Sequence, residues 1–318
     1  SDHRLNKGML GMHGNLGPNV KTNECDVLIA VGMRFDDRVT GKLETYARQA
    51  KVIHLDIDPS EIGKNVAVDV PVLGNCKRTL KMLTELIQQH KHTEWIDSFK
   101  QYEQKEFEHV IEPEVYPSEG PINMGEVINA VSEATHQQAI LVTDVGQNQM
   151  MACRYFKFSK PRSLVTSGGM GTMGFSLPAA VGATFGCKDR TVCAFMGDGG
   201  LQMNLQELGT IMEQKAPVKI ILLNNNFLGN VRQWQAMFFH RRYSFTPMMN
   251  PDYMQIASAY GIASRRVMER EELAAGIEEM LKTDGPFLLE VCVIEEGNVL
   301  PMTPPGSSVN YMMLDLDC

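Results

Sequence analysis

The stretch from 194 to 229, AFMGDGGLQMNLQELGTIMEQKAPVKIILLNNNFLG, constrains the fold of this chain more than any other segment. An apolar run precedes GDGG at 197–200, and apolar residues then recur at helical spacing over 203–214. A second apolar run ends at the three asparagines 224–226. The two expected strands cover 191–196 and 218–223. Two such strands joined by one helix predict a parallel, right-handed βαβ unit.

The polar residues that follow these two strands predict a site for a metal ion and a phosphate. Ligands of open parallel sheets bind beyond the carboxyl ends of the strands, where Asp198 and the asparagine run both fall. A carboxylate and an amide suit Mg²⁺, which takes a few oxygen ligands from protein and the rest from phosphate and water. Gly199 and Gly200 allow close approach of the backbone, and a helix N-terminus favours an anion. The residues therefore predict a site for Mg²⁺ and a diphosphate.

Composition excludes several other classes of protein. The formal net charge of the 318 residues is -8, and no basic stretch is interleaved with aromatic residues, so we expect no nucleic-acid partner. No apolar run approaches the length of a membrane span, so we expect no membrane partner. The 7 cysteines lie mostly in apolar segments without CxxC spacing, which is typical of reduced thiols in a cytoplasmic protein.

The first part of the chain predicts a small α/β domain over 1–93. Its expected strands are 27–31, 52–57 and 66–68, and its expected helix is 78–89. Asp56, at a strand end, is of the type that holds a ribose, although a turn or a helix cap is the simpler interpretation. The charged residues Arg34, Asp36, Asp37 and Arg38 fit either a ligand site or a solvated ion-pair loop.

A charged segment at 94–120 predicts a linking helix followed by a domain boundary. A second domain is expected over 121–318, with about six parallel strands and helices on both faces. Asn250 and Pro251 are expected to begin one of its helices, with Asn250 as the N-cap. The fold class predicted for the whole chain is α/β, a doubly wound, mainly parallel six-stranded sheet preceded by a truncated α/β domain. The other expected elements of the second domain are helix 123–134, strand 139–143, strand 163–166, helix 176–185, strand 262–267, helix 270–282 and strand 287–294.

The spacing of GDG and NN resembles the thiamine diphosphate motif, and the chain is similar to the catalytic subunits of acetohydroxyacid synthase (acetolactate synthase). Besides that motif, the stretches that carry the resemblance are LGMHG at 10–14, GMRFDDRVTG at 32–41, TSGGMGTMGFSLPAAVGA at 166–183, VRQWQ at 231–235 and, more weakly, NVLPMTPPG at 298–306. The first domain then corresponds to a flavin-binding domain and the second to a thiamine diphosphate-binding domain.

The resemblance implies roles for residues around thiamine diphosphate and Mg²⁺. Asp198, Asn225 and the carbonyl of Phe227 would ligate Mg²⁺. Met173 would support the thiazolium ring, although a loop methionine packed on the core is the simpler interpretation. The carbonyl of Gly171 would accept from the aminopyrimidine. The residues expected to hold the diphosphate are Gln147, Asn148, Gly199 and Gly200.

The resemblance also implies residues for the substrates and for FAD. Trp234 would line the acceptor pocket, unless it only packs on a surface helix. Arg38 would bind the carboxylate of a 2-keto acid, for which a guanidinium is suited by bidentate hydrogen bonding. The positions that match the family's structural, redox-inactive FAD are Gly32, Arg34, Asp36 and Asp56.

Several positions depart from the family pattern. Asn148 replaces a histidine, Met151 a tryptophan, Asn230 a methionine and Asn75 an aspartate. Nothing in the chain matches the family's pyrimidine-binding domain, which supplies a glutamate to the cofactor. We therefore expect a C-terminal fragment with little or no activity alone.

The implied activity is decarboxylation of pyruvate and joining of the two-carbon unit to a second 2-keto acid, pyruvate or 2-ketobutyrate, in branched-chain amino acid biosynthesis. The resemblance implies a homodimer or homotetramer and a small regulatory subunit. Two alternatives remain: another thiamine diphosphate-dependent decarboxylase or oxidase, and a nucleotide- or flavin-binding module without chemistry.

Overall fold

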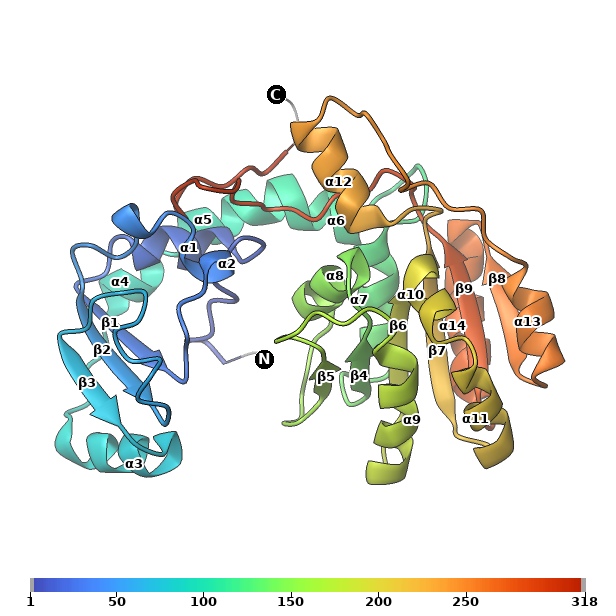
Figure 1. Cartoon of the computed structure of the whole chain (residues 1–318), viewed down its shortest axis with the longest axis horizontal. Coiled ribbons are helices and arrows are strands. Elements are labelled where there is room, and N and C mark those ends of the chain that lie inside the picture. Colours follow the sequence, from blue (N-terminus) through green and yellow to red (C-terminus); the bar gives the residue numbers. More distant parts are fainter. Residues whose placement is uncertain (1–2, 316–318) are drawn as a thin grey trace. The chain divides into compact units, whose positions relative to one another are not determined.

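The computed structural model describes residues 3–315, which divide into two compact units (Figure 1). The three-stranded unit comprises residues 3–111 and 300–315, and the six-stranded unit comprises residues 112–299. No helix within the described part of the chain is long and apolar enough to cross a membrane.

The six-stranded unit contains one fully parallel sheet with the order β5-β4-β6-β7-β9-β8. Its first strand in the chain lies near one edge, and later strands extend the sheet to both sides, which is the doubly wound arrangement that the sequence predicts. The elements in chain order are α6 (Glu112–Val115), α7 (Met124–Ala134), β4 (Ile140–Thr143), α8 (Gln147–Tyr155), β5 (Leu164–Thr166), α9 (Ser176–Gly186), β6 (Val192–Gly197), α10 (Asp198–Met203), α11 (Glu207–Gln214), β7 (Val218–Asn224), α12 (Gly229–Phe238), α13 (Tyr253–Ala259), β8 (Ala263–Val267), α14 (Arg270–Lys282) and β9 (Phe287–Cys292).

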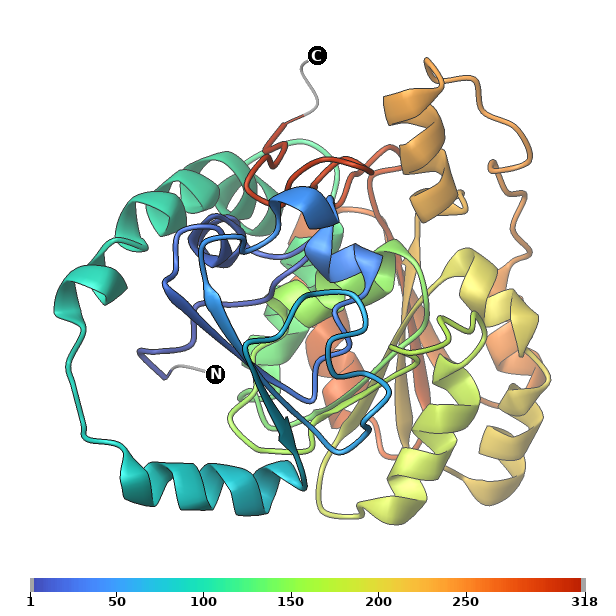
Figure 2. The same ribbon diagram turned by 60° about the vertical axis from the view of Figure 1, so that its left-hand side comes forward.

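Helices lie on both faces of this sheet (Figures 1 and 2). Helices α9, α10, α11 and α13 bury apolar residues against one face, and α7, α8 and α14 cover the other. Strand β7 is buried along its whole length, as expected for a central strand with helices on both sides. The sheet is therefore a rigid platform whose carboxyl edge carries the polar residues.

The three-stranded unit contains the parallel sheet β1-β2-β3. Its small core gathers apolar residues around Phe35, Tyr46 and Val52. The elements are α1 (Leu16–Thr22), β1 (Val27–Val31), α2 (Asp37–Thr40), η1 (Leu43–Thr45), β2 (Lys51–Asp56), β3 (Val70–Leu73), α3 (Cys76–Leu86), α4 (Thr93–Asp97), α5 (Lys100–Glu106) and the π-helix η2 (Phe107–Ile111).

Three predicted elements differ from the structure. The helix expected over 203–214 is broken, because the side chain of Asn204 donates to the carbonyl of Gly174 (2.7 Å) and the backbone leaves the helical region there. The third strand is β3 rather than 66–68, whose valines pack into the core. The N-cap of α13 is Asp252, which accepts from the backbone N–H of Met254 at 3.0 Å, and not Asn250.

The two units also differ from the expected domain ranges. Residues 300–315 belong to the three-stranded unit, because the backbone N–H of Thr303 donates to Met12 (2.8 Å) and Val309 is buried in its core. The boundary within the charged segment lies between Ile111 and Glu112, inside a run of helix. These backbone contacts between distant segments leave no periodic pattern in the sequence.

Candidate functional site

A cleft with about 600 Å³ of empty space lies at the carboxyl edge of the six-stranded sheet. The cleft is formed by the strand ends of β4, β6 and β7 and by the starts of α8, α10 and α12. Its lining residues are Met124, Val145, Gly146, Gln147, Asn148, Met173, Gly197, Asp198, Gly199, Gly200, Asn225, Phe227, Leu228, Gly229, Asn230 and Val231.

Asp198, the first residue after β6 to enter the cleft wall, is a buried carboxylate with 1% of its surface exposed. One oxygen accepts from the N–H of Gly199 (3.1 Å), and the other accepts from the side chain of Asn250 (2.7 Å). Burial raises the pKa of Asp198, which the hydrogen bond from Asn250 opposes. No cationic side chain within residues 3–315 pairs with this carboxylate. A buried carboxylate without a cation is costly, so the position favours a bound metal ion.

Asn225 and Phe227 face the same cleft as Asp198. The side-chain oxygen of Asn225 accepts from the N–H of Phe227 (3.3 Å), and its Nδ2 donates to Gln147 (3.4 Å). Because β6 and β7 are paired from Val192 to Gly197, the residues that follow them emerge side by side. The structure therefore brings the three predicted metal ligands into one cleft, and the donors are all oxygen atoms of the kind that Mg²⁺ prefers.

Gln147 and Asn148 lie in the first turn of α8, after Gly146 with φ +130°. Both N–H groups of the Gln147 carboxamide are engaged, with Gln233 (3.0 Å) and with the carbonyl of Gly297 (2.9 Å). In this conformation the side chain keeps no donor for a phosphate. The oxygen of the buried Asn148 carboxamide has no partner within the described residues. A half-turn of that carboxamide would exchange its oxygen and its NH₂ group, so that N–H donors would take the position of the unpaired oxygen.

Glycines shape the cleft floor next to Asp198. A Cβ on Gly199 would lie 2.7 Å from the side chain of Leu228, and one on Gly200 would lie 2.5 Å from the carboxylate of Asp144. Both approaches are shorter than real Cβ contacts, so a larger residue at either position would require Leu228 or Asp144 to move. Gly199 and Gly200 line the cleft without side chains, which fits the approach of a phosphate.

The loop 167–175 contributes Met173 to the cleft but leaves Gly171 outside its lining. Gly171 has φ +63° and is exposed. The loop is held by Asp144, whose carboxylate accepts from the N–H of Gly174 and from the N–H and hydroxyl of Ser176, at 2.8–3.0 Å. Sequence reasoning did not assign Asp144 a role, although its position after a buried strand at the same edge was a usable signal.

Trp234 and Arg38 lie outside this cleft. Trp234 is half-buried on α12, three residues after the cleft residue Val231, and its ring meets that of Phe238 at 5.3 Å. Arg38 belongs to the three-stranded unit, where its side chain is 63% exposed and lines a separate pocket with Met12 and Thr303. Because Val231 and Trp234 are three residues apart on α12, they lie on one face of that helix, and Trp234 is within reach of the cleft.

The four predicted flavin positions all lie in the three-stranded unit. Gly32 follows β1 and donates its N–H to Leu55 of β2, so Gly32 and Asp56 emerge at neighbouring strand ends. Gly32 has φ +61°, a conformation that favours glycine. Asp36 caps α2 and pairs with the guanidinium of Arg34 at 2.8 Å. The cap and the ion pair agree with the interpretation of the charged loop as an ion-pair loop. Asp56 is buried and accepts from the backbone N–H of Asp58 at 2.9 Å, which agrees with its interpretation as a turn residue.

Comparison with known proteins identifies the two units. The family described as "Thiamine pyrophosphate enzyme, C-terminal TPP binding domain" matches residues 144–291. The family described as "Thiamine pyrophosphate enzyme, central domain" matches residues 1–83. The first match contains the whole cleft apart from Met124, and the second contains all four predicted flavin positions.

Individual relatives are acetolactate synthases of bacteria, archaea and plants. The chain is 41% identical to the "Acetolactate synthase isozyme 2 large subunit" of Escherichia coli (strain K12), over 98% of this chain and 56% of that protein. It is 41% identical to the "Probable acetolactate synthase large subunit" of Methanocaldococcus jannaschii, over 98% and 54%. It is 40% identical to "Acetolactate synthase 2, chloroplastic" of Nicotiana tabacum, over 98% and 48%. The chain thus spans about half the length of these relatives.

The two family matches cover different units of the chain and describe domains of one enzyme family in the same order. Thiamine pyrophosphate binding is thereby assigned to the unit that contains the cleft. Residues 1–83 and 144–291 of the chain are thus similar to the central domain and the C-terminal TPP binding domain of thiamine pyrophosphate enzymes.

Proposed function

We propose that this chain is part of an acetolactate synthase that decarboxylates pyruvate and joins the two-carbon unit to a second 2-keto acid, pyruvate or 2-ketobutyrate. The observation that carries the proposal is the buried carboxylate of Asp198, which has no cation within the described residues and stands in one cleft with Asn225 and Phe227. The identity with acetolactate synthases over 98% of the chain supports this enzyme among the members of the family.

Thiamine diphosphate, when bound, supplies the carbon nucleophile and the electron sink for decarboxylation. The residues of this chain hold and orient it. Asp198, Asn225 and the carbonyl of Phe227 would bind Mg²⁺, which would supply positive charge for the diphosphate. The phosphates would be contacted by Gly199, Gly200, Asn148 and the N-terminus of α8. Gln147 is the first residue of that helix, and only its backbone would take part.

The apolar lining on the other side of the cleft would receive the organic part of the cofactor. Met173, Leu228 and Val231 supply apolar surface that would border the reacting carbon. The carbonyl of Gly171 would accept from the aminopyrimidine, which requires the loop 167–175 to close on the ligand. Trp234 would border the acceptor substrate. In the three-stranded unit, Arg38 would bind the carboxylate of a 2-keto acid.

FAD would bind to the three-stranded unit, at the strand ends that carry Gly32 and Asp56, with Arg34 and Asp36 beside them. The fit rests on the positive φ of Gly32 and on the adjacency of the two strand ends. We also propose a cytoplasmic homodimer or homotetramer that associates with a small regulatory subunit in branched-chain amino acid biosynthesis.

Titration calorimetry of the 318-residue chain with thiamine diphosphate tests the cofactor site. We expect binding in the presence of Mg²⁺, little binding in its absence, and loss of the Mg²⁺-dependent signal in Asp198→Ala. Binding that is indifferent to Mg²⁺, or that survives Asp198→Ala, would contradict the site and favour a nucleotide-binding module without chemistry.

Product analysis tests the reaction. Pyruvate is incubated with the full-length protein of which this chain is proposed to be part, together with thiamine diphosphate, Mg²⁺ and FAD, and the products are separated. Acetolactate supports the carboligase, whereas acetaldehyde or acetate in its place identifies a decarboxylase or an oxidase.

A further inference from the structure

Asn250 has an unusual set of contacts for a residue in a loop. Its Nδ2 lies 2.7 Å from Oδ2 of Asp198, 3.0 Å from Oδ1 of Asn224 and 3.1 Å from Oδ1 of Asn226. These acceptors follow or end the two central strands β6 and β7. Two hydrogen atoms serve three acceptors, and the shortest contact goes to the carboxylate, as expected for a charge-assisted hydrogen bond.

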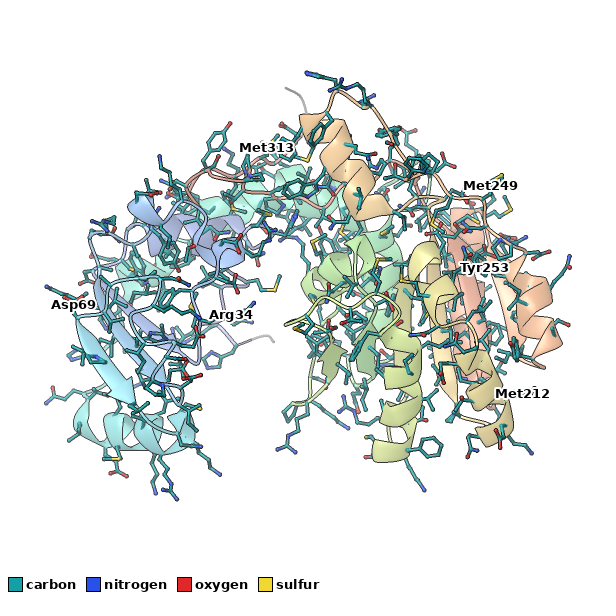
Figure 3. All side chains as sticks on the ribbon, in the orientation of Figure 1. Arg34, Asp69, Met212, Met249, Tyr253 and Met313 are labelled. Atoms are coloured by element: carbon teal, nitrogen blue, oxygen red, sulfur yellow. The ribbon has the colours of Figure 1, made fainter. Side chains whose placement is uncertain are left out.

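The orientation of the Asn250 carboxamide is fixed by its other end. Its Oδ1 lies 3.0 Å from Nε2 of Gln202 and 3.1 Å from the hydroxyl of Tyr253, and both of these groups can donate. Tyr253 is fully buried at the start of α13 and is labelled in Figure 3. A half-turn of the carboxamide would place its N–H groups against these donors and its oxygen against three acceptors. The N–H groups therefore point at Asp198.

The acceptors of Asn250 are themselves anchored. Nδ2 of Asn224 donates to the buried carboxylate of Glu290 on β9 (2.8 Å), and the other oxygen of Glu290 accepts from Arg266 on β8 (2.6 Å). Arg266 also donates to Asp252 (3.0 Å), two residues after Asn250. The ion pair between Arg266 and Glu290 thus holds both Asn224 and the loop that carries Asn250.

We propose that Asn250 is a positioning residue for Mg²⁺ binding, which fixes the carboxylate of Asp198 through Oδ2 and so orients its remaining lone pairs. The proposal rests on the proposed function, because it assigns Mg²⁺ to Asp198. A carboxylate on a single Cβ–Cγ bond rotates unless a partner holds it, and ligands held by a hydrogen-bonded partner bind metal more tightly. Asn250 neither lines the cleft nor belongs to the predicted ligands.

The test compares the Mg²⁺ affinities of variants of the 318-residue chain by titration calorimetry in saturating thiamine diphosphate. Asn250→Ala is expected to weaken Mg²⁺ binding by 10- to 100-fold, the range typical for the partners of metal ligands. Excess Mg²⁺ should restore binding of thiamine diphosphate to the level of the unaltered chain. Tyr253→Phe removes one donor from Oδ1 of Asn250 and should weaken Mg²⁺ binding in the same direction, by a smaller factor.

Asn129→Ala is the matched control, because Asn129 is a buried asparagine of the same unit that does not line the cleft. Its Nδ2 donates to Glu133 on the same helix. This variant should keep the Mg²⁺ affinity of the unaltered chain. Equal Mg²⁺ affinities for Asn250→Ala and the unaltered chain would overturn the proposal, as would an equal loss in Asn129→Ala.

A double-mutant cycle tests the same contact without any ligand. Asn250→Ala should change the unfolding equilibrium constant at least fivefold less in an Asp198→Ala background than in the unaltered chain, because the hydrogen bond to the carboxylate is then already absent. Equal changes in both backgrounds would overturn the proposal. Mg²⁺ binding by the unaltered chain with an unchanged affinity in Asn250→Ala would overturn the role of Asn250 and leave the proposed function standing. An unaltered chain that binds no Mg²⁺ with thiamine diphosphate would refute both.

Discussion

At the scale of single residues, Asp144 shows how one buried carboxylate can hold a loop. Its side chain is fully buried and accepts from Gly174, at the end of the loop that carries Met173, and from Ser176, at the start of α9. A carboxylate at this position also interacts favourably with the N-terminus of α9, a helix of 11 residues. The placement of Met173 in the cleft therefore depends on Asp144.

We predict that Asp144→Asn destabilises the chain by about 2–4 kcal/mol, because the new NH₂ group faces N–H donors in a buried site. Chemical denaturation measures the loss of stability, and limited proteolysis should detect new cleavage within 167–175. Asp97→Asn, at an exposed residue, is the control and should stay within about 0.5 kcal/mol of the unaltered chain. An unchanged stability of Asp144→Asn would contradict the assigned hydrogen bonds.

Glu114 predicts a pH dependence of stability. Burial raises the pKa of Glu114 from 4.5 to about 7, opposed by the N–H of Gly125 and by Arg154, while Glu126 raises it further. The folded chain therefore binds this proton more tightly than the unfolded chain does. Its contribution to stability is complete below pH 4.5 and is lost as the pH rises through 7.

Glu114→Gln should remove this loss, since the carboxamide keeps an oxygen for the N–H of Gly125 and carries no charge. The variant is expected to gain about 3 kcal/mol over the unaltered chain at pH 8 and little at pH 4.5, measured by urea denaturation at both pH values. A constant difference between the two proteins at all pH values would show that Glu114 does not titrate in this range.

At the scale of elements, α12 holds the segment that leads out of the six-stranded unit. Gln233, buried on α12, accepts from the N–H of Val299 (2.9 Å), donates to its carbonyl (3.2 Å) and accepts from Gln147 (3.0 Å). Arg232, also buried, donates to Gly297 and Asn298. These contacts join α12, α8 and the segment 297–299 into one polar layer behind the cleft.

Gln233→Ala leaves several buried partners unpaired, and we predict a loss of about 2–4 kcal/mol in the free energy of unfolding. Urea denaturation measures this loss. Gln104→Ala removes a glutamine from an exposed helical pair with Glu108 and should cost no more than about 0.5 kcal/mol. Similar losses in the two variants would contradict a specific role for the polar layer.

The elements also show what the sequence could and could not predict. The apolar periodicities located β1, α14 and the parallel sheet closely, because strands and helices buried on known faces impose regular patterns. Asn250 was interpreted as a helix cap, since Asn-Pro favours a helix start, whereas its side chain turns to residues 26 and 52 positions away. Contacts between distant segments, such as that of Asp144 with the loop, have no local signature.

At the scale of the whole molecule, the predicted ligand positions of both units lie at the carboxyl ends of parallel strands. In each unit parallel strands end side by side, and the residues just beyond them form the predicted ligand positions, Asp198 and Asn225 in one and Gly32 and Asp56 in the other. The metal positions follow from the GDG and NN spacing, while the substrate positions Arg38 and Trp234 rest on the resemblance alone. Arg38 and Trp234 belong to different units, so one unit by itself does not contain both.

The most direct test of the central claim is a crystal structure of the chain with thiamine diphosphate and Mn²⁺ in place of Mg²⁺, with the metal located by its anomalous scattering. The account predicts one strong anomalous peak between the carboxylate of Asp198, the side-chain oxygen of Asn225 and the carbonyl of Phe227, next to a diphosphate at the Gly199-Gly200 turn. Thiamine diphosphate bound with no metal at Asp198, or with the metal peak elsewhere in the chain, would contradict it.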